Sequence, residues 1–183
     1  MVANPHAAVT DTGRASVYRC EALYARMCAR ANPSSGPVIT LLAGSEVMLP
    51  AERRFADVEQ IAPYVAGVLA AVRSRWPGVI PGVEVRERRG HSHAHWQAPG
   101  TIAIPNSETM LREHIVLHEL AHHIDHHTRT APAPVHGSSF RSVLCQLHTA
   151  ATGVAGGWAL GVIFDINLNN FNNRIRGYHH GND

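Results

Sequence analysis

The sequence predicts an α+β fold in which a small three-stranded antiparallel sheet packs against one central helix and the helices that flank it. Two observations predict this arrangement. Three short β-like segments follow one another at residues 83–88, 94–97 and 101–104, with turn residues between them. On both sides of this cluster, apolar residues instead recur at helical spacing. The expected order is therefore helix, small sheet, central helix and further helices.

The first 50 residues are expected to form a helical extension with a short β segment. Apolar residues recur at helical spacing between residues 11 and 31, and the run 32–37, with two prolines and a glycine, ends that helix. Residues 38–42 and 46–49 are typical of two strands joined by a turn. No residue of this extension shows recognisable chemistry, so the functional domain is expected at residues 51–183.

Four helices are expected in residues 51–183. They cover about residues 55–76, 106–127, 140–151 and 158–167. Pro63 either kinks the first of them or starts its main segment. Asn106 or Ser107, directly after a proline, supplies the N-cap of the second, which is the central helix. The tail from Asn169 is rich in asparagine and glycine and is expected to fray.

Composition restricts the class of function. The chain has 183 residues, 45% of them hydrophobic, which is enough for one domain with a real core. A net charge of +2 gives no electrostatic case for nucleic acid. Its three cysteines form no C-x-x-C pair and predict buried thiols in a reducing compartment. With no signal peptide and no apolar run near the ~18 residues of a membrane span, the expected location is cytoplasmic.

The central helix carries the run His118-Glu119-Leu120-Ala121-His122, which has the form H-E-x-x-H. Two histidines four residues apart on a helix lie on one face and can share one metal ion. Glu119 would then stand beside the open coordination position, where water binds. The alternative is a histidine-rich surface helix. The apolar pattern of the helix favours a buried metal site, because an unpaired buried imidazole is costly.

A catalytic zinc site keeps three protein ligands, so a third must be found. A ligand six residues beyond the second histidine is excluded because Thr128 stands there, and a later glutamate is excluded because none follows Glu119. His136 is the preferred third ligand, since it follows a proline-bearing loop that can fold back and precedes a glycine and a helix. The other candidates are Asp165, His123, Asp125, His126, His127 and His148.

Further polar residues have open roles. Arg141, Tyr178 and His179 are candidates for stabilising an oxyanion, and Asp125 or Glu113 for orienting a ligand imidazole. The alternating residues His91, His93 and His95 would face one side of a strand and could hold a second metal, but a solvated turn is the favoured interpretation.

The residues His118, Glu119, His122, His136, Gly137 and Phe140 resemble the SprT/WLM-type zinc peptidases and the uncharacterised actinobacterial HExxH metallohydrolases. The resemblance covers about residues 55–150 and is strongest at the metal site. It implies a minimal zincin-like core that binds one Zn²⁺ per chain through His118, His122 and His136, with Glu119 as general base and acid. The chain has no cysteine zinc ribbon and no basic DNA-binding segment, so a role on DNA is not implied.

The expected function is a zinc-dependent hydrolase, in particular a metallopeptidase that acts on a peptide or protein substrate. The last strand, just before the central helix, is expected at the sheet edge, where an extended peptide could pair with it; the alternative is an ordinary edge strand. The alternative is a non-catalytic or regulatory metal-binding protein on a zincin scaffold, such as an ImmA-like protein or a phage or host interaction module. The sequence does not indicate the oligomeric state.

Overall fold

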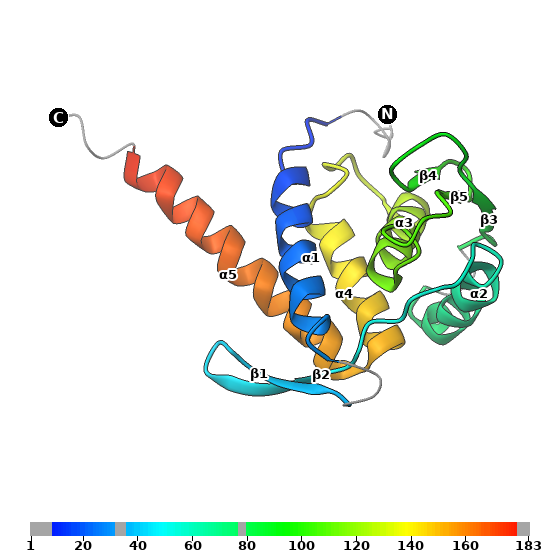
Figure 1. Cartoon of the computed structure of the whole chain (residues 1–183). Helices are drawn as coiled ribbons and strands as arrows, with labels where there is room; N and C mark the ends of the chain where they lie inside the picture. The colour runs from blue at the N-terminus through cyan, green and yellow to red at the C-terminus, as the bar shows by residue number, and fades with distance from the viewer. Residues whose placement is uncertain (1–8, 32–35, 77–79, 179–183) are drawn as a thin grey trace.

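The computed structural model describes residues 9–31, 36–76 and 80–178, with side chains up to residue 168. The fold is α+β, with helices and two small sheets (Figure 1). Its elements are α1 (Arg14–Cys28), β1 (Val38–Leu42), β2 (Ser45–Leu49), α2 (Ile61–Val72), the short 3₁₀ helix η1 (Arg73–Arg75), β3 (Glu84–Glu87), β4 (His95–Gln97), β5 (Thr101–Ile104), α3 (Glu113–Thr128), α4 (Ser138–Thr152) and α5 (Val154–Tyr178). The predicted hairpin near residue 44 is confirmed, because β1 and β2 pair antiparallel.

The three-stranded sheet is mixed, and the prediction of an antiparallel sheet was wrong. Its order is β3-β5-β4, with β4 antiparallel to β5 and β3 parallel to β5. The strands alternate in direction along the chain, but the last one inserts between the first two. Burial explains the order: Ile102, Ala103 and Ile104 of β5 are at most 2% exposed. The charged and polar side chains of β3 and β4 are better tolerated at the two edges.

The central helix, α3, begins at Glu113 and not at residue 106 or 107 as predicted. The residues before it pair with another segment of the chain. Arg112 is extended and forms an isolated β-bridge with Arg54, and Phe55 donates its backbone N–H to Leu111 at 3.0 Å. The preceding residues form a turn, in which Leu111 donates its N–H to the Ser107 carbonyl at 2.9 Å, and the pairing holds Arg112 extended, so the helix starts only at Glu113. On the other side of the bridge, Phe55 is held at the expected beginning of α2, and residues 56–60 form bends and turns before α2 starts at Ile61.

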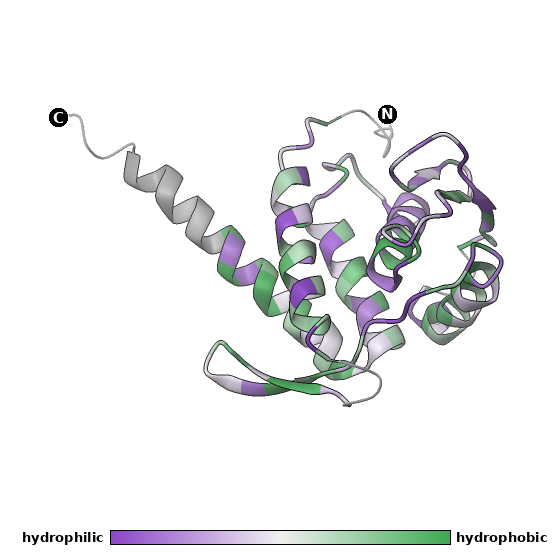
Figure 2. Ribbon diagram, in the orientation of Figure 1, coloured by the Kyte–Doolittle hydropathy of each residue, from purple (hydrophilic) through white to green (hydrophobic). Residues whose placement is uncertain are grey.

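The hydrophobic core lies between the helices. In Figure 1, α1, α4 and the beginning of α5 run side by side, and α3 lies between α4 and the three-stranded sheet. Figure 2 shows hydrophobic residues along these helices and on the β1–β2 hairpin. Val17 of α1, Leu117 of α3, Leu144 of α4 and Leu160 of α5 are all fully buried in one cluster. The first helix is therefore packed into the same core as the helix that carries the H-E-x-x-H motif.

A single residue separates the last two helices. Gly153 has φ of 84°, a conformation that other residues rarely adopt, and it ends α4 directly before α5 begins. The predicted break was longer, and α5 continues to Tyr178, beyond the end expected near residue 167. Among the helices in the described part of the chain, none is both long and apolar enough to cross a membrane.

His148 of α4 is buried in this core and makes the fold sensitive to acid. It is 1% exposed, and neither ring nitrogen has a hydrogen-bond partner among the described residues. Burial lowers the pKa of His148 from 6.5 to about 3. Because the folded state resists protonation, its stability is complete above pH 6.5 and falls as the pH drops toward 3. The loss at pH 3 is about 5 kcal/mol at 1.36 kcal/mol per pKa unit.

We expect the substitution His148→Leu to remove this loss. Leucine fills a similar volume and has no nitrogen to desolvate, so the variant should be at least as stable as the wild type at neutral pH. Urea unfolding measured between pH 7 and pH 3 tests this. The difference in unfolding free energy between variant and wild type should grow as the pH falls, and a constant difference would show that His148 does not titrate as described.

Candidate metal centre

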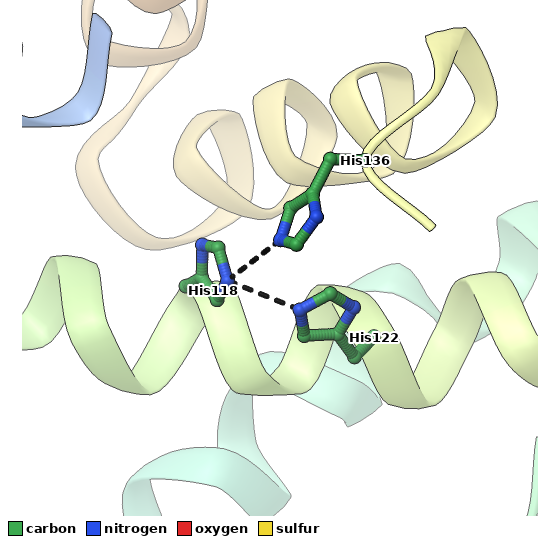
Figure 3. Close-up of side chains that lie close together, drawn as sticks. All are labelled: His118, His122 and His136. Atoms are coloured by element: carbon green, nitrogen blue, oxygen red, sulfur yellow. Dashed lines mark hydrogen bonds between the residues drawn. The ribbon is translucent and has the colours of Figure 1, made fainter. Parts of the chain in front are cut away.

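Three histidines converge at one point beside α3 (Figure 3). His118 and His122 lie one turn apart on the same face of α3, as predicted from their spacing. His136, two residues before the start of α4, points its ring toward them. The Nε2 atom of His118 lies 3.0 Å from Nε2 of His122 and 3.4 Å from Nε2 of His136. The three ligand atoms all lie within 4.8 Å of one another, so this group could bind a metal ion.

The spacing of these nitrogens fits a tetrahedral ion. Two nitrogens bound at about 2.05 Å to one tetrahedral zinc lie about 3.3 Å apart. The distances of 3.0 and 3.4 Å between the ring nitrogens are close to this value. His118 and His136 are also nearly buried, at 6% and 4% exposed. Three buried imidazoles with their nitrogens this close together are costly without a partner, and a bound metal ion would supply that partner.

Two of the three imidazole rings, those of His118 and His136, are hydrogen-bonded to carboxylates through the nitrogen that faces away from the common centre. Nδ1 of His118 donates to Glu21 of α1, whose two oxygens both lie 2.9 Å away. Nδ1 of His136 donates to Asp11 at 2.7 Å, and the backbone N–H of His136 donates to the same carboxylate at 3.2 Å. With the Nδ1 protons directed to these carboxylates, the Nε2 lone pairs of both rings point to the common centre. Such carboxylate–histidine pairs fix the ring tautomer and strengthen the ring as a metal ligand.

The loop after α3 is folded so that His136 returns to the helix. Arg129 donates to the backbone carbonyl of Ala133 at 2.9 Å, and Gly137 donates its N–H to the carbonyl of Pro134 at 2.9 Å. A side chain at Gly137 would come within 2.9 Å of that carbonyl, so glycine is required for the tight turn. At Gly13, before α1, a side chain would come within 2.6 Å of the His136 carbonyl. The start of α1 therefore packs directly on the backbone of the third histidine.

The roles of Asp11 and Glu21 were missed in the sequence, where the first 50 residues showed no recognisable chemistry. The residues proposed to orient the rings, Asp125 and Glu113, are engaged elsewhere. Asp125 pairs with Arg129, and Glu113 accepts a hydrogen bond from the Tyr64 hydroxyl at 2.8 Å. Glu21 does leave one signal, since it falls on the buried face of α1. A buried acid on an amphipathic helix needs a partner, but the sequence does not say which one.

The electrostatic environment favours a cation at the centre. Burial alone would lower the pKa of His118, but the Glu21 carboxylate raises it above its usual value. The field that favours a proton on this ring also favours a metal ion bound to it. Burial holds the pKa of His122 well below its usual value and, despite the opposing effect of Asp11, lowers that of His136. These two rings stay neutral, which is the form that binds metal.

Glu119 lies in the same cavity as the three histidines. The cavity has a volume of about 360 Å³, and His118, Glu119, His122 and His136 all line it. Glu119 is 8% exposed, and burial raises the pKa of its carboxyl group. Its Oε2 accepts the backbone N–H of Trp96 in β4 at 2.7 Å. One carboxylate oxygen is thus fixed by the edge strand, while the side chain faces the cavity that holds the three rings.

The edge strand next to the site is β4, since β5, which precedes the central helix, lies in the middle of the sheet. The expectation that the last strand forms the edge was therefore wrong. The outward N–H of Trp96 is bonded to Glu119 and so is not free to pair with an added strand.

The other predicted ligands lie apart from the centre. His123 is bonded to the Pro81 carbonyl, His127 to the Pro99 carbonyl, and the His126 ring packs against Trp96. His148 is buried in the core, and Asp165 is exposed on α5.

The residues predicted as candidates for an oxyanion site or a second metal site are not part of the three-histidine group. Arg141 lies near the site and donates to the His136 carbonyl at 3.5 Å. The Tyr178 side chain and His179 lie outside what the structure describes. His91 and His93 are exposed and precede β4, while His95 begins that strand. Within the described residues, these three histidines are not among the groups close enough together to hold a metal ion.

We expect Glu21→Gln to weaken zinc binding by about 10- to 100-fold, the usual effect of removing a carboxylate behind a ligand histidine. Glutamine keeps the size of the side chain but removes the charge that offsets the bound cation. Competition titration with a fluorescent zinc chelator measures the effect. Glu46→Gln, an exposed acid on β2, is the matched control and should bind zinc as the wild type does. Equal zinc affinity of the Glu21 variant and the wild type would contradict this role.

Comparisons with known proteins identify no relative. No family model, no curated protein and no solved structure matches the chain. Any statement about function therefore rests on the residues of this site and on their geometry.

Proposed function

We propose that the protein is a zinc-dependent hydrolase, in particular a metallopeptidase, built on a minimal zincin-like core. One observation carries the proposal: three imidazole nitrogens from an H-E-x-x-H helix and from His136 meet at one point, and the glutamate of the same motif lines the cavity there. Three nitrogen ligands and access from a cavity are the properties of a catalytic zinc site, since a structural site would supply a fourth protein ligand. A set of imidazole ligands suits zinc better than magnesium or calcium.

The residues of the chain would divide the chemistry as follows. His118, His122 and His136 would hold the ion, with Glu21 and Asp11 fixing the orientation of two of the rings. When bound there, zinc would supply Lewis-acid chemistry, polarising a carbonyl and making a water molecule more acidic. Glu119 would accept the proton of the attacking water and pass it to the leaving amine. The Trp96 N–H would keep the Glu119 carboxylate in the orientation that this transfer requires.

The alternative is a metal-binding protein without catalytic activity, of the regulatory or interaction type. Such a protein would need the three histidines but not a carboxylate beside them. The buried position of Glu119 supports the catalytic proposal, because a carboxylate at 8% exposure is costly to bury and metal binding alone does not require it.

Hydrolysis of a peptide library by the purified protein tests the proposal. We expect cleavage that stops when a chelator removes the metal and returns when about one equivalent of zinc is added. Products identified by mass spectrometry would show whether peptide bonds are cut. A protein that binds zinc but cleaves no peptide of the library would contradict the peptidase proposal and favour the non-catalytic alternative.

A further inference from the structure

A second cavity opens beside the metal centre and is larger than the first. It has a volume of about 590 Å³ and shares six lining residues with the 360 Å³ cavity, including His118 and Glu119. The two cavities therefore meet at the H-E-x-x-H motif and extend from it in two directions. A substrate peptide lying through both cavities would cross the metal centre. The residues before the cleaved bond would then lie in one cavity and the residues after it in the other.

The larger cavity is lined by several basic side chains. Two arginines and three further histidines line it besides the metal ligand, namely Arg14, Arg88, His93, His95 and His114. Its two acids are Glu21 and Glu119. Glu21 is engaged by the His118 ring, and Glu119 by the Trp96 N–H. Neither acid forms an ion pair with an arginine of the cavity.

Arg14 and Arg88 are the two arginines of this cavity, and neither is held in an ion pair with another described residue. Within the described residues, neither lies within 4.0 Å of a carboxylate. Arg14 lies over the ring of Tyr18, 5.6 Å from its centre, and Arg88 donates to the His93 carbonyl at 2.7 Å. By contrast, the His114 ring, which also lines this cavity, is paired with the Glu52 carboxylate. The two arginines come from different elements, since Arg14 begins α1 and Arg88 directly follows β3.

The smaller cavity differs in its charge balance. Arg129 is paired there with Asp125, and Asp11 is bonded to His136. Arg14 and Glu119 line both cavities, and the other charged residues of the smaller cavity each have an ion-pair or hydrogen-bond partner. The larger cavity, which holds both arginines that lack an ion pair within the described part of the chain, is therefore the better place for a negative charge.

We propose that the larger cavity binds an acidic side chain of the substrate, held by Arg14 and Arg88, so that the enzyme cleaves peptides with an acidic residue on one side of the scissile bond. This inference rests on the proposed peptidase function and adds the substrate class to it. Ala22, Met110 and Ile115 line the same cavity and provide apolar contact for the stem of such a side chain. Guanidinium groups suit the recognition of carboxylates because their donors match both carboxylate oxygens.

Cleavage of a matched peptide panel tests the inference. The peptides share one sequence and differ at a single position, which is glutamate, glutamine or lysine, placed in turn on each side of the cleaved bond. We expect kcat/KM to be about tenfold higher for glutamate than for glutamine on one side only, as two exposed ion pairs would give. The preference should shrink as salt is added.

The double variant Arg14→Gln/Arg88→Gln should abolish this preference without loss of zinc. Arg26→Gln/Arg86→Gln is the matched control, because it removes the same charge from α1 and β3 at residues that line neither cavity. Equal rates for glutamate and glutamine peptides, or a preference that survives in the double variant, would overturn the inference.

A binding measurement separates this inference from the proposed function. Fluorescently labelled glutamate and glutamine peptides are titrated with the zinc-loaded Glu119→Gln variant, and anisotropy reports binding without turnover. If the wild type cleaves nothing, the peptidase proposal fails, yet tighter binding of the glutamate peptide that depends on Arg14 and Arg88 would still support the anionic site. Equal binding of both peptides would overturn that site.

Discussion

Replacing His136 by alanine is expected to weaken zinc binding by at least about 100-fold, one ligand's share of the affinity of a protein zinc site. The effect is large because His136 supplies the only ligand of the proposed centre that is not on α3. His118 and His122 alone would leave two positions of a tetrahedral ion to water. Zinc affinity measured by competition with a chelator of known affinity would show the loss directly.

The control for this experiment is His126→Ala. His126 lies one turn beyond His122 on α3 and lines the same cavity, but it is not one of the three converging rings. That variant should keep its zinc. Because His136 is buried, His136→Gln is compared as well, and circular dichroism of the metal-free proteins shows whether each variant folds. A folded His136 variant that binds zinc as tightly as the wild type would exclude His136 as a ligand.

Glu119→Gln is expected to lower kcat by about 10²- to 10⁴-fold while leaving zinc bound, as removal of a general base does. Glutamine has nearly the same shape but cannot accept the proton of the attacking water. It also keeps an oxygen that can accept the Trp96 N–H, so the local structure should be retained. Rates of peptide cleavage by the two zinc-loaded proteins, at saturating substrate, give the comparison.

Glu108→Gln, an exposed glutamate before α3, is the matched control and should be as active as the wild type. If Glu119→Gln keeps full activity with zinc bound, the glutamate is not the base, and the mechanism proposed for this centre is wrong. If instead the variant loses its zinc, its inactivity says nothing about proton transfer. For this reason the metal content of each sample must accompany each rate.

Local patterns in the sequence were enough to predict which three histidines would converge. The spacing of His118 and His122 defines one helical face, and the proline-bearing loop after Thr128 allows His136 to fold back. Both are short-range properties, in which each residue is placed by its neighbours in the chain. The structure brings together the three histidines that the sequence selected, and Glu119 lines the same cavity.

Features that depend on distant segments were not predicted. The mixed sheet arises because the buried strand β5 takes the middle position, which alternation of strand direction does not reveal. The late start of α3 follows from the bridge between Arg54 and Arg112, which are far apart in the sequence. Glu21 and His118 are separated by 97 positions, and no local pattern links them. These pairings are consequences of tertiary packing.

Metal analysis of the wild-type protein, purified without added metal and without chelator, tests the central claim most directly. Inductively coupled plasma mass spectrometry compared with protein concentration gives the number of each ion per chain. The arrangement of His118, His122 and His136 predicts about one zinc per chain. Protein that contains no zinc, and that binds none when about one equivalent is titrated into the folded chain, would contradict the claim that these three histidines form a zinc site.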